Sequence, residues 1–137
     1  MEIQGTIEIA CTVEVVHEYL CDAAKLPEWI GDMREFELMA DGSFHQVVSQ
    51  AGRKSLLTGR ITSGLGTDRV VMVLESDEVV VEAEHRLTAT ATGTRLDHTA
   101  TARFTNALLG MLAGGMKGSA TRHLNENLER LRLRLEL

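Results

Sequence analysis

The sequence predicts an α+β domain in which a curved, seven-stranded antiparallel sheet wraps around a long C-terminal helix. Three features predict this fold: an opening strand followed by two short helical segments, six strand-like runs separated by short turns, and a long amphipathic segment at the end. A curved sheet with one apolar face must be covered, and the last segment is the only long amphipathic element available. The length of 137 residues suits a single domain spanning residues 1–137.

The first thirty residues predict one strand and two helices. Thr12 can cap a helix that runs to about Asp22, because its hydroxyl accepts a hydrogen bond from the first helical turn. Pro27 is suited to the first turn of a second, very short helix over residues 26–30. The opening ten residues alternate in polarity, which predicts a half-buried strand whose inward residues are Ile3, Gly5, Ile7 and Ile9.

The middle of the chain predicts a meander of strands, because short turns favour consecutive antiparallel hairpins over parallel crossovers. The predicted strands cover residues 34–40, 44–50, 54–62, 68–75, 79–91 and 94–104. After them, an apolar stripe at helical spacing predicts a final helix of about thirty residues. Its members are Leu112, Met116, Ala120, Leu124, Leu128, Leu131 and Leu135.

Composition excludes several classes of function. A net charge of −6 with no dominant basic patch argues against a nucleic-acid partner. No apolar stretch reaches the length that crosses a bilayer, so we expect no transmembrane segment. Two cysteines and no leader sequence favour a cytoplasmic protein. Nucleotide-binding glycine motifs and the nucleophile elbow of hydrolases are absent, and we expect no cofactor.

Four segments carry a resemblance to a known superfamily. They are the strand Ile7-Glu-Ile-Ala10, the helix Val13-Glu-Val-Val-His-Glu-Tyr-Leu-Cys-Asp22, Pro27-Glu-Trp29, and Gly93-Thr-Arg-Leu96. In order and spacing they resemble the START/Bet v 1-like superfamily, also called SRPBCC, which includes polyketide cyclase/dehydrase-like proteins and has the helix-grip fold. One departure is His17, where the group often has a large aromatic residue.

The resemblance implies binding of a hydrophobic or amphipathic small molecule, such as a lipid, sterol or polyketide, in a cavity between sheet and helix. Some members of the group are cyclases or aromatases, and others are chaperone cofactors. Because one fold serves many functions, the resemblance alone does not choose among these.

Two histidines are the strongest candidates for the site. Strand periodicity places His85 and His98 on the apolar face of neighbouring strands. A two-residue turn at Thr92-Gly93 would make them diagonal neighbours about 7–8 Å apart, with Leu87 opposite His98 and His85 opposite Ala100. They would then orient a polar group of the ligand. The alternative is that they are core histidines bonded to one another, to water or to a nearby backbone group.

The remaining candidates surround these histidines or cover them. Glycines 110, 114, 115 and 118 weaken the last helix, which suggests either an adaptable lid over the cavity, close packing on the sheet, or a non-helical start. Trp29 would line the mouth of the cavity or plug the end of the sheet. The predicted ligand-binding set is His85, His98, Leu87, Ala100, Ala102, Leu112, Met116 and Trp29.

Three other interpretations stay open at this point. The first is a cyclase or dehydratase in which His85 or His98 is the general base, although no carboxylate or nucleophile shares their face. The second is an interaction module, or a homodimer, that uses outward valines at 71, 73 and 80. The third is a metal site at His17 and Cys21, which share a helix face but lack a third ligand; we expect no metal.

Overall fold

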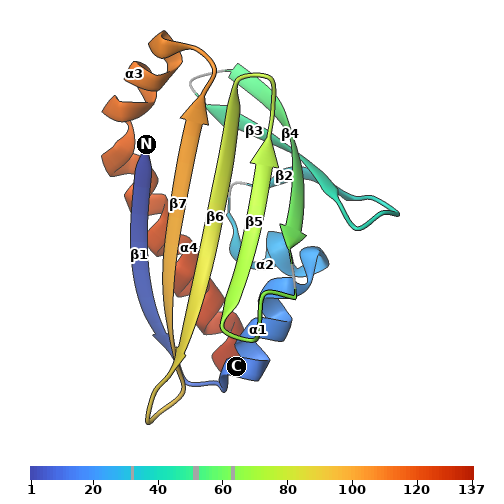
Figure 1. Cartoon of the computed structure of the whole chain (residues 1–137), viewed down its shortest axis with the longest axis vertical. Coiled ribbons are helices and arrows are strands. Elements are labelled where there is room, and N and C mark those ends of the chain that lie inside the picture. The colour runs from blue at the N-terminus through green and yellow to red at the C-terminus, as the bar shows by residue number, and fades with distance from the viewer. Residues whose placement is uncertain (32, 51–52, 63) are drawn as a thin grey trace.

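The computed structural model describes residues 1–31, 33–50, 53–62 and 64–137 and shows one curved sheet packed on a helix (Figure 1). Its strands pair antiparallel in the order β1-β7-β6-β5-β4-β3-β2. The elements are β1 (Glu2–Ile9), α1 (Val13–Cys21), a 3₁₀ turn (Ala23–Lys25), α2 (Leu26–Trp29), β2 (Arg34–Leu38), β3 (Phe44–Gln50), β4 (Arg53–Thr62), β5 (Arg69–Glu75), β6 (Val79–Ala89), β7 (Thr94–Phe104), α3 (Ala107–Gly115) and α4 (Lys117–Glu136). The predicted fold class is confirmed.

The meander from β2 to β7 agrees with the sequence pattern, and the structure places β1 in the sheet beside β7. Each strand from β2 onward pairs with the next one, and β1 pairs with β7, so that Ile7 lies opposite Leu96. The face of the sheet that packs against α4 is called the inner face below. Its residues come from the apolar phase of each strand, as the period of two predicts.

The connection between β6 and β7 differs from the prediction. Ala89 pairs with Thr94, and the N–H of Thr90 donates to the carbonyl of Gly93 at 2.9 Å, so the loop has four residues rather than two. A Cβ on Gly93 would overlap the carbonyl oxygen of Ile9, which shows that this loop packs against the end of β1. The register therefore shifts by two residues, and each side chain keeps its predicted face.

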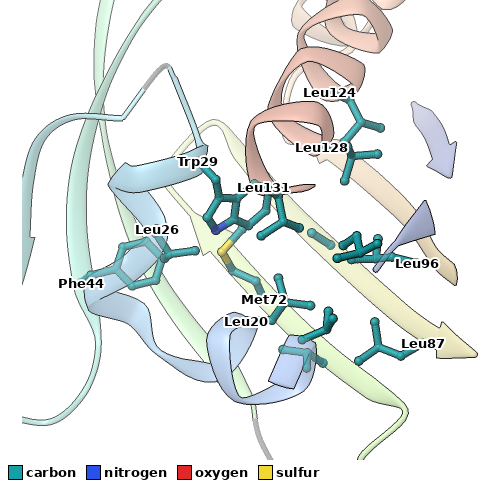
Figure 2. Close-up of a cluster of buried hydrophobic side chains, with 14 residues drawn as sticks. Leu20, Leu26, Trp29, Phe44, Met72, Leu87, Leu96, Leu124, Leu128 and Leu131 are labelled. Atoms are coloured by element: carbon teal, nitrogen blue, oxygen red, sulfur yellow. The ribbon is translucent and has the colours of Figure 1, made fainter. Parts of the chain in front are cut away.

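Helices α1 and α2 close one end of the inner face, opposite to α3 (Figure 1). The hydroxyl of Thr12 accepts from the N–H of Val15, as the capping pattern predicts, and Pro27 lies in the first turn of α2. The helices bury Val16, Leu20, Leu26 and Trp29. Figure 2 shows several of these side chains meeting Leu131 of α4 and Met72 of β5 in one apolar cluster.

The C-terminal helical segment is interrupted at Met116, a break that the apolar stripe did not predict. Leu124, Leu128 and Leu131 of α4 are buried against the sheet. A Cβ on Gly5 of β1 would lie only 2.9 Å from a methyl of Leu128, so α4 packs closely on β1 at a glycine. By contrast, a Cβ on Gly114, Gly115 or Gly118 would meet nothing within 4 Å, so close packing does not explain these glycines.

Gly59 of β4 provides a test of the core packing. A Cβ at this position would overlap the ring of Phe44, which is fully buried, and would crowd Leu74. We expect Gly59→Ala to lower the free energy of unfolding by roughly 1–3 kcal/mol, because overpacking forces the surrounding side chains to shift.

Urea unfolding of Gly59→Ala beside Gly118→Ala measures this effect. Gly118 has open space around it, so its replacement should be neutral or stabilise α4 by up to about 1 kcal/mol. Equal stability of the two variants would contradict the packing of Phe44 over Gly59.

Candidate ligand-binding site

The inner face of β6 and β7 forms a ladder of side-chain pairs whose burial decreases toward α3. The rungs, from the α1 end upward, are Leu87–Leu96, His85–His98, Ala83–Ala100, Val81–Ala102 and Val79–Phe104. Both side chains are buried in the first two rungs, only Ala83 is buried in the third, and all four in the last two are partly exposed. The inner face is therefore closed at its α1 end and less covered near α3.

His85 and His98 lie directly opposite each other, which corrects the predicted diagonal placement. Both are buried, at 3% and 6% exposure. Their Nδ1 atoms are 3.1 Å apart and their ring centroids 4.6 Å apart. One Nδ1 must donate and the other accept, so the two neutral rings have opposite tautomers, with the second proton of the pair on the Nε2 of the accepting ring.

Burial determines the protonation of both rings. Desolvation lowers the pKa of His98 to about 4. It also lowers the pKa of His85 well below its ordinary value, and the neighbouring His98 adds to this effect. Desolvation acts in this direction because the charged imidazolium loses its water shell without gaining a counter-charge. Both rings are neutral at pH 7.

Trp29 closes the ladder next to the histidine pair. Its ring meets His85 edge-on at a centroid distance of 5.9 Å, and its side chain is 2% exposed. Its carbonyl accepts a 3.0 Å hydrogen bond from the guanidinium of Arg130 on α4. The indole Nε1 is buried and has no hydrogen-bond partner among the described residues. Trp29 is buried in one apolar cluster with Leu131 and Met72 (Figure 2), which favours the predicted plug over the predicted mouth.

Gln46 of β3 is a polar residue of the inner face that the sequence interpretation missed. It is buried, and its Oε1 has no hydrogen-bond partner among the described residues. The period of two that places Phe44 inward also places Gln46 inward, so the alternation contained the signal. A buried amide oxygen without a donor is unusual, since such atoms are nearly always hydrogen-bonded.

The other predicted site residues divide into two groups. Leu87, Ala100 and Ala102 share the ladder with the histidines, as predicted. Met116 lies at the break between α3 and α4 with 43% of its side chain exposed, and Leu108 and Met111 of α3 are also exposed. The side chain of Leu112 lies outside the described residues.

Two hollows lined by described residues lie away from the imidazoles. One of about 600 Å³ follows α4 from Gly118 to Glu129. Another of about 680 Å³ lies between β4 and the turn that joins β5 to β6, where Leu56 and Glu75 line it. Neither is lined by His85 or His98. These two hollows leave the expectation that both imidazoles line a cavity as a prediction; the rings themselves lie at the packed end of the ladder.

Two of the alternative sites lose support. The outward valines do not form a fully exposed patch, because Val71 is buried and Val73 and Val80 are only partly exposed. The sulfur of Cys21 lies 3.7 Å from Nε2 of His17, but the described residues contain no group of three or more potential metal ligands. Among the described helices, none is both long and apolar enough to span a membrane.

Several solved structures share this fold. A START superfamily protein from Mycobacterium smegmatis aligns with a TM-score of 0.75 and 16% identity over 98% of each chain. A Thermus thermophilus protein aligns with a TM-score of 0.80 and 17% identity over 98% of this chain and 97% of its own. The di-domain ARO/CYC protein StfQ of the steffimycin biosynthetic pathway aligns with a TM-score of 0.74 and 16% identity over 96% of this chain and 49% of its own.

Sequence comparison identifies the family. Among curated proteins, none matches the chain significantly. The family model described as polyketide cyclase / dehydrase and lipid transport matches residues 1–136. The START-like helix-grip architecture, the sequence resemblance and this match over nearly the whole chain agree: the chain belongs to the polyketide cyclase/dehydrase and lipid transport family.

Proposed function

We propose that the chain binds a hydrophobic or amphipathic small molecule on the inner face, above the histidine pair and toward α3. The observation that carries this proposal is the burial gradient along the β6–β7 ladder. Apolar side chains at Val79, Val81, Ala102 and Phe104 face inward and remain partly exposed, whereas the rungs below them are packed. A ligand in this region would complete the apolar layer that the short side chains leave unfinished.

The size of the region suits a molecule of one or a few rings. The three upper rungs, from Ala83 to Val79, extend about 13 Å along the strand at roughly 3.3 Å per residue. Every 100 Å² of apolar ligand and protein surface removed from water contributes about 2.5 kcal/mol before the costs of association. Shape and apolar burial therefore supply most of the affinity.

The proposal favours binding over bond breaking. A general base works best when its pKa lies near the operating pH. Burial holds the pKa of His98 at about 4 and that of His85 well below its usual value, so both are weak bases. The inward positions of β5, β6 and β7 also contain no carboxylate that could pair with them. A turnover rate that titrates with a histidine-like pKa and disappears on replacement of either ring would instead indicate a cyclase.

A matched pair of tryptophan variants tests where the ligand binds. Ala102 faces inward on the ladder, and the adjacent Thr101 is exposed on the outer face. We expect Ala102→Trp to weaken binding of the neutral probe N-phenyl-1-naphthylamine at least about tenfold, because the indole fills the space that the ligand needs. Thr101→Trp should retain the affinity of the unmodified protein. Probe fluorescence in titrations of each variant measures this.

Two further measurements complete the test. Ala102→Leu should show an intermediate loss, and thermal unfolding of each variant confirms that the fold is kept. Equal affinities of the Ala102→Trp and Thr101→Trp variants would place the ligand away from the inner face. Native mass spectrometry of protein purified from its own source would then name the chemical class of the retained molecule.

A further inference from the structure

The closed end of the ladder contains a hydrogen-bond donor without an acceptor. The indole Nε1 of Trp29 is buried and has no partner among the described residues, although buried tryptophan N–H groups usually find one. A buried donor without an acceptor has lost its hydrogen bond to water and gained none in return. The same indole meets His85 edge-on at a centroid distance of 5.9 Å. A ligand oxygen that reached this point would recover the lost hydrogen bond.

The histidine pair has both a hydrogen-bond donor and a hydrogen-bond acceptor among its Nε2 atoms. Because the two Nδ1 atoms bond to each other at 3.1 Å, the Nε2 of one ring carries a proton and the Nε2 of the other carries a lone pair. Exchange of the two tautomers reverses these roles. The pair can thus donate to a ketone oxygen or accept from a hydroxyl without any change of charge.

The described strands around this group offer no compensating positive charge on their inward face. The inward positions of β5, β6 and β7 hold no lysine or arginine. Arg130 of α4 is a cation next to Trp29, and its guanidinium donates away from the strands, to the Trp29 carbonyl at 3.0 Å and to Oδ1 of Asn127 at 2.7 Å. A carboxylate or phosphate buried between the strands would lose its water shell without gaining a counter-charge from their inward positions.

We infer that the closed end of the ladder recognises an uncharged oxygen of the ligand, a ketone or a hydroxyl, through the Trp29 N–H and the His85–His98 pair, and rejects a carboxylate there. The apolar body of the ligand then lies on the Ala83–Ala100 and Val81–Ala102 rungs. This inference rests on the proposed function and names its ligand class: a neutral, oxygen-bearing apolar molecule that enters oxygen first.

Three probes with one ring system test the inference. They are 2-naphthol, 2-methylnaphthalene and 2-naphthoate, which differ only in the group that would reach Trp29. Calorimetric titration should show 2-naphthol binding roughly tenfold more tightly than 2-methylnaphthalene, the difference that one net hydrogen bond supplies. The charged 2-naphthoate should bind more weakly than both.

Nuclear magnetic resonance reports the contact itself without any substitution. The chain has one tryptophan, so its indole N–H gives a single resonance. This resonance should move downfield when 2-naphthol binds, because the proton gains an acceptor. With 2-methylnaphthalene it should not move in that direction.

Two variants show whether the N–H of Trp29, rather than the shape of its ring, causes the preference for 2-naphthol. Replacing Trp29 by its sulfur isostere 3-benzothienylalanine removes the N–H and should reduce the preference for 2-naphthol over 2-methylnaphthalene to near unity. Tyr19→Phe removes a hydroxyl that donates to Glu28 on the α1–α2 surface and should keep the preference.

The outcomes distinguish this inference from the proposed function. If 2-naphthol and 2-methylnaphthalene bind equally and the indole resonance stays in place, the inference is wrong and binding on the inner face stands. Tighter binding of 2-naphthoate than of 2-naphthol would also overturn it. If none of the three probes binds, both the inference and the proposed function are overturned.

Discussion

Replacing His98 alone by leucine should destabilise the fold by about 1–3 kcal/mol, because it leaves Nδ1 of His85 buried without a partner. His85→Leu should have a similar cost for the same reason. Replacing both histidines removes donor and acceptor together, so we expect the double variant to lose clearly less stability than the sum of the two single variants.

Urea unfolding of the unmodified protein, the two single variants and the double variant measures how strongly the two histidines are coupled in stability. Strictly additive losses would show that the two rings do not bond to each other. Because the double variant keeps an apolar ladder, we also expect its ligand preference to change more than its thermal stability. A double variant that does not fold would instead support the view that the pair serves the core alone.

Lowering the pH from 7 to 5 should destabilise the folded state through the same two residues. Burial depresses the folded pKa of His98 to about 4, and that of His85 well below 6.5, whereas the unfolded chain titrates near 6.5. Between these values the unfolded state binds more protons, so stability is complete above pH 6.5 and decreases as the pH falls. The loss is at most about 1.4 kcal/mol per pH unit for each histidine.

The double leucine variant is the control for this pH dependence. Asp41, Glu84 and Glu129 have lowered pKa values through hydrogen bonds to Ser43 and to nearby arginines, so their contributions are lost only at lower pH. The unfolding free energy of the double variant should therefore change much less between pH 7 and 5. Parallel pH profiles of the two proteins would contradict the buried, neutral state of the pair.

Much of the fold follows from short-range patterns. Alternation with a period of two places Ile7 inward on β1 and both histidines inward on β6 and β7, and the hydroxyl of Thr12 begins α1 where the period changes. Loop length does not follow from such patterns. The β6–β7 loop has four residues because it packs on the end of β1, and this contact brings His85 directly opposite His98.

The sequence by itself determined which face each strand presents and the order of the elements, because these depend on periodicity and on local turn and capping chemistry. Its motifs, and not its periodicity, carried the resemblance to the family. Only the tertiary structure decided the pairing of the two imidazoles, the burial of the Trp29 N–H without an acceptor among the described residues, and the exposure gradient toward α3. Register, desolvation and coverage depend on how distant segments such as α2, α4 and β1 pack together, and no local pattern encodes that packing.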